Sequence, residues 1–251
     1  MNKKQRIGVF DSGIGGLNVL NNLVEQFPNE DFLYVGDNLN VPYGIKTEEE
    51  LKEIISKIFR FFEEENVKAI IIACNTASAA SMTLDCKVPV FRIIEPTAMN
   101  ALKVSNNIGV LATNFTIESK AYDLYLKEKM KGIKASPFVT IVENDSIQEA
   151  DSKKIIKDIL LPYKDDVDTI ILGCTHFSVL EEEVKNILGD VKIVDSCKAF
   201  STILKDYLDE NDLNNDSNDN RVVKILFTKE ANINTKWFKY PFEGIEFVNI
   251  K

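Results

Sequence analysis

The sequence predicts an α/β fold with mostly parallel sheets. Short apolar runs rich in β-branched residues recur along the 251 residues, and longer stretches with helical spacing separate most of them. Runs such as 69–73 are apolar on both faces, as expected of a parallel strand that helices cover on each side. The alternation of strand and helix favours parallel pairing.

Each element follows from its local pattern. The predicted strands are residues 6–10, 31–35, 68–73, 88–94, 107–112, 138–142, 167–172, 191–194 and 222–227. Stretch 48–62 is typical of the intervening helices, because its apolar residues fall on one stripe. Segment 209–220, rich in Asp and Asn, is predicted to be a solvated connector back to the first part of the fold. It is not a calcium loop, since Ser217 replaces the required glycine.

Composition excludes several classes of protein. The net charge of −9, from 30 Lys and Arg against 39 Asp and Glu, argues against nucleic acid or an anionic membrane as the main partner. No apolar run approaches the roughly 20 residues that span a bilayer, and the N-terminus lacks the core of a signal peptide. Four cysteines without a CxxC pair indicate reduced thiols. We therefore expect a soluble, cytoplasmic protein.

Chemistry is expected where the predicted strands end, because ligands of open α/β sheets bind beyond the carboxyl ends of the strands. The first such turn holds Asp11, Ser12 and a glycine cluster of Gly13, Gly15 and Gly16. This cluster fits neither the dinucleotide nor the P-loop pattern, but its backbone N–H groups can receive a small anion such as a carboxylate.

Two other strand ends resemble each other. Residues 70–78 and 170–178 align with Cys74 on Cys174, which is a weak internal repeat. The repeat predicts two similar lobes, each with one cysteine at the carboxyl edge of its sheet, and a ligand site where those edges meet.

Cys74 and Cys174 are the candidate reactive thiols. A cysteine at a strand end is usually a small hydrophobic residue, and Cys86 and Cys197 are interpreted in that way. Cys74 and Cys174 differ, because each precedes a predicted helix whose N-terminus favours a thiolate. His176, the single histidine, follows Cys174 by two residues and can tune that thiol or donate a proton.

Several chemistries fit these residues. Zinc held by Cys74, Cys174, His176 and Asp11 is conceivable, although the close ligand pairs of structural zinc sites are missing. A Cys-His hydrolase is a second alternative, but it leaves one cysteine idle. Two thiols that face each other across a small-anion site can instead remove a proton from a carbon and return one on the opposite face, which is racemisation. No cofactor motif and no evident Schiff-base lysine accompany them.

Further motifs surround these residues and run in order from residue 7 to about 196. They are 7–17 (IGVFDSGIGGL), 34–37 (YVGD), 41–44 (VPYG), 73–78 (ACNTAS), 94–96 (IEP) and 172–177 (LGCTHF). Weaker ones are Thr113, Thr116, Ser119, Tyr122, Glu143 and 194–196. Together they resemble the cofactor-independent glutamate racemases.

The resemblance implies two pseudo-symmetric α/β lobes with the active site between them, and a homodimer. We expect residues 1–95 plus 208–251 in the first lobe and 96–207 in the second. The implied acid/base pair is Cys74 and Cys174, with Asp11 assisting the first and His176 the second, and with neither cofactor nor metal. The implied substrate-binding residues are Asp11, Ser12, Tyr43, Gly44, Asn75, Thr76, Thr113, Thr116, Thr175 and His176. Departures from the pattern of that family are residues 38–40, Arg92 and 144–146.

The expected activity is interconversion of L- and D-glutamate, supplying D-glutamate for bacterial peptidoglycan. A racemase or decarboxylase of a related acid such as aspartate is the first alternative. A paralogue that binds an amino acid or a protein without turnover is the second. Retention of both thiols and both helper residues argues against the paralogue, since a binding module has no need of two opposed thiols.

Overall fold

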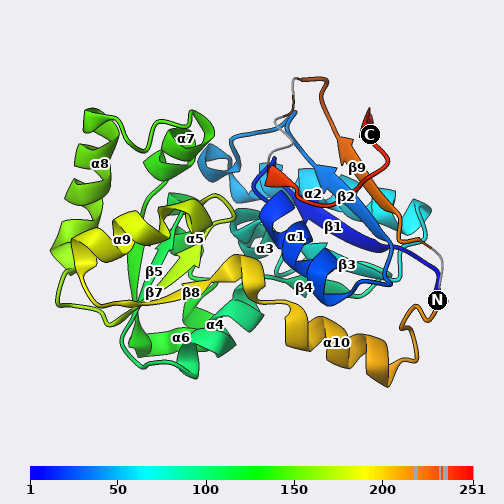
Figure 1. Ribbon diagram of the computed structural model, residues 1–251, viewed down its shortest axis with the longest axis horizontal. Helices are drawn as coiled ribbons and strands as arrows, with labels where there is room; N and C mark the ends of the chain where they lie inside the picture. Colours follow the sequence, from blue (N-terminus) through cyan, green and yellow to red (C-terminus); the bar gives the residue numbers. More distant parts are fainter. Residues whose placement is uncertain (218–219, 232, 234–236, 251) are drawn as a thin grey trace. The chain divides into compact units, whose positions relative to one another are not determined.

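The computed structural model describes residues 1–217, 220–231, 233 and 237–250. It divides into two compact units, which Figure 1 shows as two sheets flanked by helices. Unit 1 comprises Met1–Ile93 and Phe200–Lys251, and unit 2 comprises Ile94–Ala199.

Unit 1 is built on a parallel sheet. Its strands are β1 (Ile7–Asp11), β2 (Phe32–Gly36), β3 (Ala69–Ile72), β4 (Val90–Arg92), β9 (Val223–Phe227) and β10 (Ile245–Phe247). Its helices are α1 (Leu17–Gln26), η1 (Tyr43–Ile45), α2 (Glu48–Glu64), α3 (Asn75–Ala80) and α10 (Ser201–Glu210). Among the described residues the strand order is β10-β9-β2-β1-β3-β4, with every neighbouring pair parallel.

Unit 2 repeats this plan on a smaller scale. Its strands are β5 (Ile108–Ala112), β6 (Met130–Lys134), β7 (Thr169–Gly173) and β8 (Lys192–Asp195), in the parallel order β6-β5-β7-β8. Its α-helices are α4 (Ile94–Leu102), α5 (Asn114–Glu118), α6 (Asp123–Leu126), α7 (Pro137–Glu143), α8 (Ala150–Leu160) and α9 (Glu181–Leu188). Short 3₁₀ turns are η2 (Lys127–Lys129), η3 (Leu161–Tyr163), η4 (Phe177–Leu180) and η5 (Ser196–Lys198).

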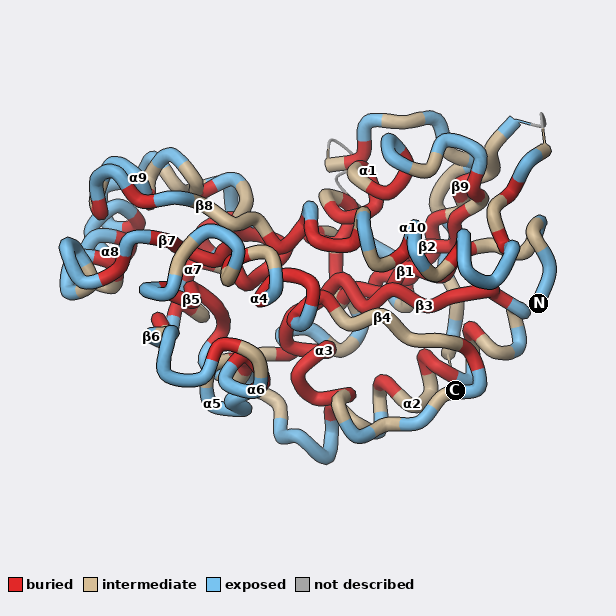
Figure 2. Tube along the Cα trace, turned by 90° about the horizontal axis from the view of Figure 1, so that it is seen from below, coloured by how far each residue is buried: buried red, intermediate tan, exposed pale blue. Residues whose placement is uncertain are grey.

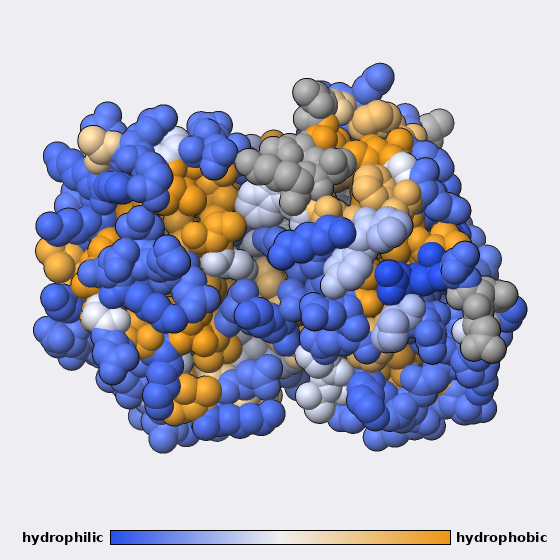
Figure 3. Space-filling model, in the orientation of Figure 1, coloured by the Kyte–Doolittle hydropathy of each residue, from blue (hydrophilic) through white to orange (hydrophobic). Residues whose placement is uncertain are grey.

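The predicted α/β class with parallel sheets is confirmed. Every residue of β1, β2, β3, β5 and β7 is buried, as the runs apolar on both faces predicted, and Figure 2 shows these strands as the buried centre of each unit. The helices screen these strands from water. Hydrophilic residues accordingly cover most of the face seen in Figure 3, with hydrophobic ones showing between them. Among the described residues, no helix is long and apolar enough to cross a membrane.

Helix α2 confirms the predicted helix at 48–62 and begins at a capping box. The Glu50 N–H donates to Thr47 Oγ1 at 3.2 Å, while the Thr47 N–H donates to a Glu50 carboxylate oxygen at 2.8 Å. These bonds satisfy two N–H groups that would otherwise lack partners at the helix start. One stripe of the helix, with Leu51, Ile55 and Ile58, is buried on the sheet side.

The predicted strand at 138–142 is wrong, because this run lies in helix α7. A run of five residues, four of them apolar, fits a buried helical turn as well as a strand, and Pro137 suits the first turn of a helix. The helix buries Phe138, Ile141 and Val142 at positions i, i+3 and i+4. The place beside β5 is taken instead by β6, whose residues other than Ile133 are at least partly exposed. Because most residues of β6 are at least partly exposed and β10 has only three residues, neither was predicted as a strand from the sequence.

Segment 209–220 is less solvated than its composition predicts. Residues 218 and 219 lie outside the described residues, but Leu213 and Asn215 are buried. The Lys68 side chain, fully buried, donates from Nζ to the backbone carbonyls of Leu213 and Lys3, both at 2.7 Å. Nζ also lies 2.5 Å from Glu30 Oε2, and the Asn215 N–H donates to Glu30 Oε1 at 2.8 Å.

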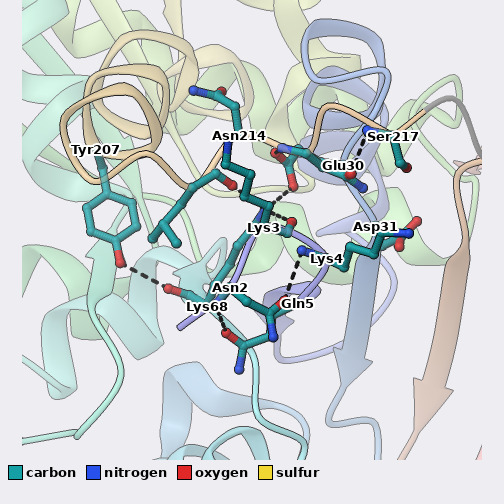
Figure 4. A network of polar contacts seen from close by, with 12 residues as sticks. Asn2, Lys3, Lys4, Gln5, Glu30, Asp31, Lys68, Tyr207, Asn214 and Ser217 are labelled. Carbon is teal, nitrogen blue, oxygen red and sulfur yellow. Dashed lines mark hydrogen bonds and ion pairs between the residues drawn. The ribbon is translucent and has the colours of Figure 1, made fainter.

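This polar network, seen in Figure 4, fastens the N-terminus and the segment before β9 to the start of β3. Helix α10 joins it, because the Tyr207 hydroxyl donates to the Lys68 carbonyl at 3.1 Å. The Tyr207 ring also lies against Phe91, with ring centroids 5.1 Å apart. These contacts explain why unit 1 resumes at Phe200 and not near residue 208.

Candidate functional site

The candidate residues of unit 1 gather at the carboxyl edge of its sheet. Asp11 ends β1, and Cys74 follows β3 as the N-cap of α3. Strands β1 and β3 are parallel neighbours, with Phe10 paired to Ile72, so the residues that follow them meet at one edge. Cys74 Sγ lies 3.5 Å from Ser12 Oγ and accepts the N–H of Ala77 at 3.4 Å.

The glycine-rich turn wraps around the carboxylate of Asp11, which is fully buried. Asp11 Oδ2 accepts the N–H of Gly13 at 3.0 Å, so this N–H, one of those expected to face a bound anion, serves the protein's own carboxylate. A Cβ at Gly16 would lie 2.3 Å from the Asp11 Cβ. Only glycine allows this close approach, which explains one glycine of the cluster.

Tyr43 is held by Asp37, a residue to which the sequence assigned no role. The Tyr43 hydroxyl donates to Asp37 Oδ2 at 2.6 Å, and Thr228 Oγ1 donates to Asp37 Oδ1 at 2.6 Å. Burial raises the pKa of Tyr43 well above its usual value, and the nearby groups of Asp37, Cys74 and Asp11 raise it further. The Tyr43 hydroxyl therefore stays protonated at neutral pH.

Tyr43→Phe is expected to destabilise the protein by about 1–3 kcal/mol, because the buried Asp37 carboxylate loses one of its donors. Urea unfolding measures the change. The matched control is Tyr163→Phe, which removes a weaker 3.3 Å bond to the carbonyl of Gly132 nearer the surface. Equal losses in the two variants would contradict a special role for the Asp37 contact.

Helix α3 carries Asn75 and Thr76, both buried, and its far end is capped by Arg92. The Arg92 guanidinium donates to the Ser81 carbonyl at 2.7 Å, to Ser81 Oγ at 3.1 Å and to the Leu84 carbonyl at 3.1 Å. A cation at the carbonyl end of a helix is favourable. The unusual arginine thus steadies the helix that begins at Cys74.

The candidate residues of unit 2 lie at the corresponding edge of its own sheet. Cys174 and Thr175 follow β7, and His176 is the N-cap of η4. Thr113, the N-cap of α5, follows the neighbouring strand β5, and its Oγ1 lies 2.9 Å from Thr116 Oγ1. Strands β5 and β7 are parallel neighbours, so these residues meet at one edge.

His176 lies between a thiol and a carboxylate. Its Nδ1 is 3.8 Å from Cys174 Sγ, and its Nε2 is 3.2 Å from Glu143 Oε1. His176 is buried, whereas the Glu143 side chain is 43% exposed. The two contacts orient the imidazole ring with one nitrogen toward the thiol. Glu143, a weak motif match in the sequence, acquires this contact because α7 packs against η4.

The two thiols occupy equivalent places in their units. Strand β3 lies between β1 and β4, and β7 lies between β5 and β8, so each cysteine follows the corresponding strand of its sheet. Both cysteines are buried and neither forms a disulfide. The structure thus brings the candidate residues together as one cluster in each unit. Among the described residues, no three His, Cys, Asp or Glu side chains gather as metal ligands would.

Comparisons with known proteins agree with the fold and with these motifs. The model of the Asp/Glu/Hydantoin racemase family matches residues 7–202. A glutamate racemase of Aquifex aeolicus is 40% identical over 211 residues, which cover 81% of this chain and 83% of that protein.

Solved structures give the same result. A glutamate racemase isoform from Bacillus anthracis has a TM-score of 0.92 and 34% identity, with both chains fully covered. A glutamate racemase from Francisella tularensis, solved in complex with D-glutamate, has a TM-score of 0.90 and 30% identity, covering 99% of this chain and 98% of the other.

Proposed function

The chain belongs to the Asp/Glu/Hydantoin racemase family, and on that premise we propose that it interconverts L-glutamate and D-glutamate. The observation that carries the proposal is the pair of equivalent thiols. Cys74 and Cys174 each follow the corresponding strand of a similar sheet, and each has a polar helper in its own unit. The names of the relatives support glutamate as the substrate.

The proposed reaction uses one thiol for each face of the substrate. The Cys74 thiolate removes the α-proton of D-glutamate, and the Cys174 thiol donates its proton to the opposite face of the resulting carbanion. For L-glutamate the roles reverse. Each turnover leaves one cysteine protonated and the other ionised, so the protons balance without an added acid, base or cofactor. Asp11 assists Cys74, and His176 assists Cys174.

The substrate is proposed to bind among polar groups beside the thiols. In unit 1 these are Ser12, Tyr43, Gly44, Asn75 and Thr76, with Asp11. In unit 2 they are Thr113, Thr116, Thr175 and His176. The Tyr43 hydroxyl stays protonated because burial keeps its pKa high, but its one hydrogen goes to Asp37 Oδ2, so Tyr43 is proposed to contact the substrate through its oxygen as an acceptor.

We further propose that the product is D-glutamate for peptidoglycan, that the protein is cytoplasmic and that it works as a homodimer. All four cysteines are expected to be reduced, which fits the cytoplasm. The proposed mechanism also needs reduced thiols, because an oxidised thiol cannot exchange a proton. Gel filtration of the purified protein tests the dimer.

A cofactor-free assay tests the activity. Purified protein is incubated with L-glutamate or with L-aspartate, and the optical rotation is followed. We expect rotation to be lost with glutamate and retained with aspartate. Loss of rotation with aspartate alone would indicate that aspartate is the substrate, and retained rotation with both acids would favour a binding protein.

Each helper residue is expected to matter mainly for one direction of the racemisation. Asp11→Asn should lower kcat about tenfold or more where Cys74 starts the reaction, and His176→Asn should do so where Cys174 starts it. Because the two enantiomers have equal free energies in solution, kcat/KM must fall equally in both directions, and the asymmetry appears in kcat and KM separately. Circular dichroism from each enantiomer measures both. Matching kcat patterns in the two variants would refute the pairing of one helper with each thiol.

A further inference from the structure

We propose that Ser178 and Asp195 are positioning residues which, together with Cys197, anchor the turn that carries Cys174 and His176. This role deepens the proposed two-thiol function and rests on it. The sequence pattern predicts that Cys197 is a small hydrophobic residue, and it indicates no role for Ser178 beyond its place in the internal repeat.

The anchor begins at the end of β8. Asp195 Oδ1 accepts the hydroxyl of Ser178 at 2.9 Å and the N–H of Cys197, also at 2.9 Å. Ser178 Oγ also lies 3.3 Å from Cys197 Sγ. One hydroxyl hydrogen serves both acceptors, and the shorter contact, to the carboxylate, is the stronger of the two.

Cys197 carries the anchor to the middle of the turn. Its Sγ donates to the backbone carbonyl of Thr175 at 3.8 Å, and the Cys197 side chain is 2% exposed. Thr175 lies between Cys174 and His176. The turn is therefore fastened at two points, the Thr175 carbonyl and the Ser178 hydroxyl, which lie on either side of His176.

Unit 1 shows a comparable arrangement at the aligned serine, with backbone groups in place of the carboxylate. Ser78, four residues after Cys74, donates from Oγ to the Ile72 carbonyl at 3.2 Å and accepts the N–H of Ile93, also at 3.2 Å. Ile93 directly follows β4, which occupies the place in unit 1 that β8 occupies in unit 2. In both units, a serine four residues after the thiol ties the thiol-bearing turn to the end of the neighbouring strand.

The anchor matters because the contact it supports is long. Cys174 Sγ and His176 Nδ1 are 3.8 Å apart, near the limit at which a sulfur still makes a hydrogen bond. A small displacement of the turn would separate the thiol from its helper, and reacting groups lose rate steeply when they are misplaced.

Ser178→Ala tests this role, because it removes the hydroxyl from a half-buried position without adding bulk. We expect kcat/KM to fall about tenfold in both directions, the loss that corresponds to one ordinary hydrogen bond. The rate of alkylation by iodoacetamide, measured by peptide mass spectrometry, should change about threefold or more at Cys174 and stay unchanged at Cys74. Ser178→Thr, which keeps the hydroxyl, should restore both readouts.

Two further variants complete the experiment. Asp195→Asn weakens the anchor from its other end and should reproduce the effect of Ser178→Ala. It therefore tests the anchor even if the Ser178→Ala variant folds poorly. Ser152→Ala is the matched control, because the Ser152 hydroxyl bonds to Ser146 in the same unit and does not touch the turn.

The outcomes separate the anchor from the activity. A folded Ser178→Ala protein with unchanged kcat/KM and unchanged alkylation of Cys174 would overturn the anchor, as would equal alkylation changes at both thiols. If the wild-type chain racemises neither acid, the proposed function fails. The alkylation of Cys174 then still decides whether Ser178 holds the turn.

Discussion

Cys74→Ser and Cys174→Ser are each expected to lower the rate of glutamate racemisation by about 10²–10⁴-fold, the contribution of a positioned acid or base. A serine hydroxyl is a far weaker acid than a thiol, so neither variant can pass the α-proton at a useful rate. Circular dichroism of L- and D-glutamate solutions measures the loss. Cys86→Ser is the matched control, because Cys86 lies beside Glu63, outside both clusters, and should keep full activity.

Solvent deuterium gives the two-thiol mechanism a sharper test. In deuterated water the product formed from either enantiomer should carry deuterium at the α-carbon, while substrate recovered early should carry none. The deuterium is carried by the thiol opposite the one that removes the proton, so it is delivered only to the face that gives product. Deuterium in early recovered substrate would instead indicate a single base that serves both faces.

The largest effect on stability is expected at the buried ion pair of Lys68 and Glu30. Lys68→Met should lower the free energy of unfolding by about 3–5 kcal/mol, because it leaves the Glu30 carboxylate, whose side chain is 5% exposed, without its cation. The carbonyls of Lys3 and Leu213 lose their donor as well. Urea unfolding measures the change.

A double-mutant cycle measures the coupling between Lys68 and Glu30 apart from their contacts with other groups. Burial lowers the pKa of Lys68 although Glu30 opposes this, so the ammonium gains little net stabilisation from its position. Glu30→Gln combined with Lys68→Met should therefore lose clearly less than the sum of the single changes. The control is Lys57→Met, which breaks an exposed pair with Glu53 and should cost less than about 1 kcal/mol. Additive losses at Lys68 and Glu30 would contradict the ion-pair interpretation.

Local patterns in the sequence were sufficient for most of the fold. A run such as 69–73 is apolar on both faces only if helices cover both sides of the strand, so it predicts its own surroundings. The fully buried strands β1, β2, β3, β5 and β7 were predicted for this reason, and the helix at 48–62 was predicted from its single apolar stripe. The other predicted strands except 138–142 also overlap strands of the structure, although β4 keeps only Val90–Arg92 of the predicted 88–94. The 138–142 run failed because its length and composition suit a strand and a buried helical turn equally, and only the occupied place beside β5 decides between them.

The sequence by itself determined the family, the α/β class and the two strand ends at which Cys74 and Cys174 stand, because each of these is written in consecutive residues. Only the tertiary structure decided what holds those residues. Asp37 on Tyr43, Glu143 beside His176 and the bonds of Ser178 and Asp195 with Cys197 join different elements. Such contacts depend on which strands are neighbours and how helices pack on them, and no local pattern carries that information.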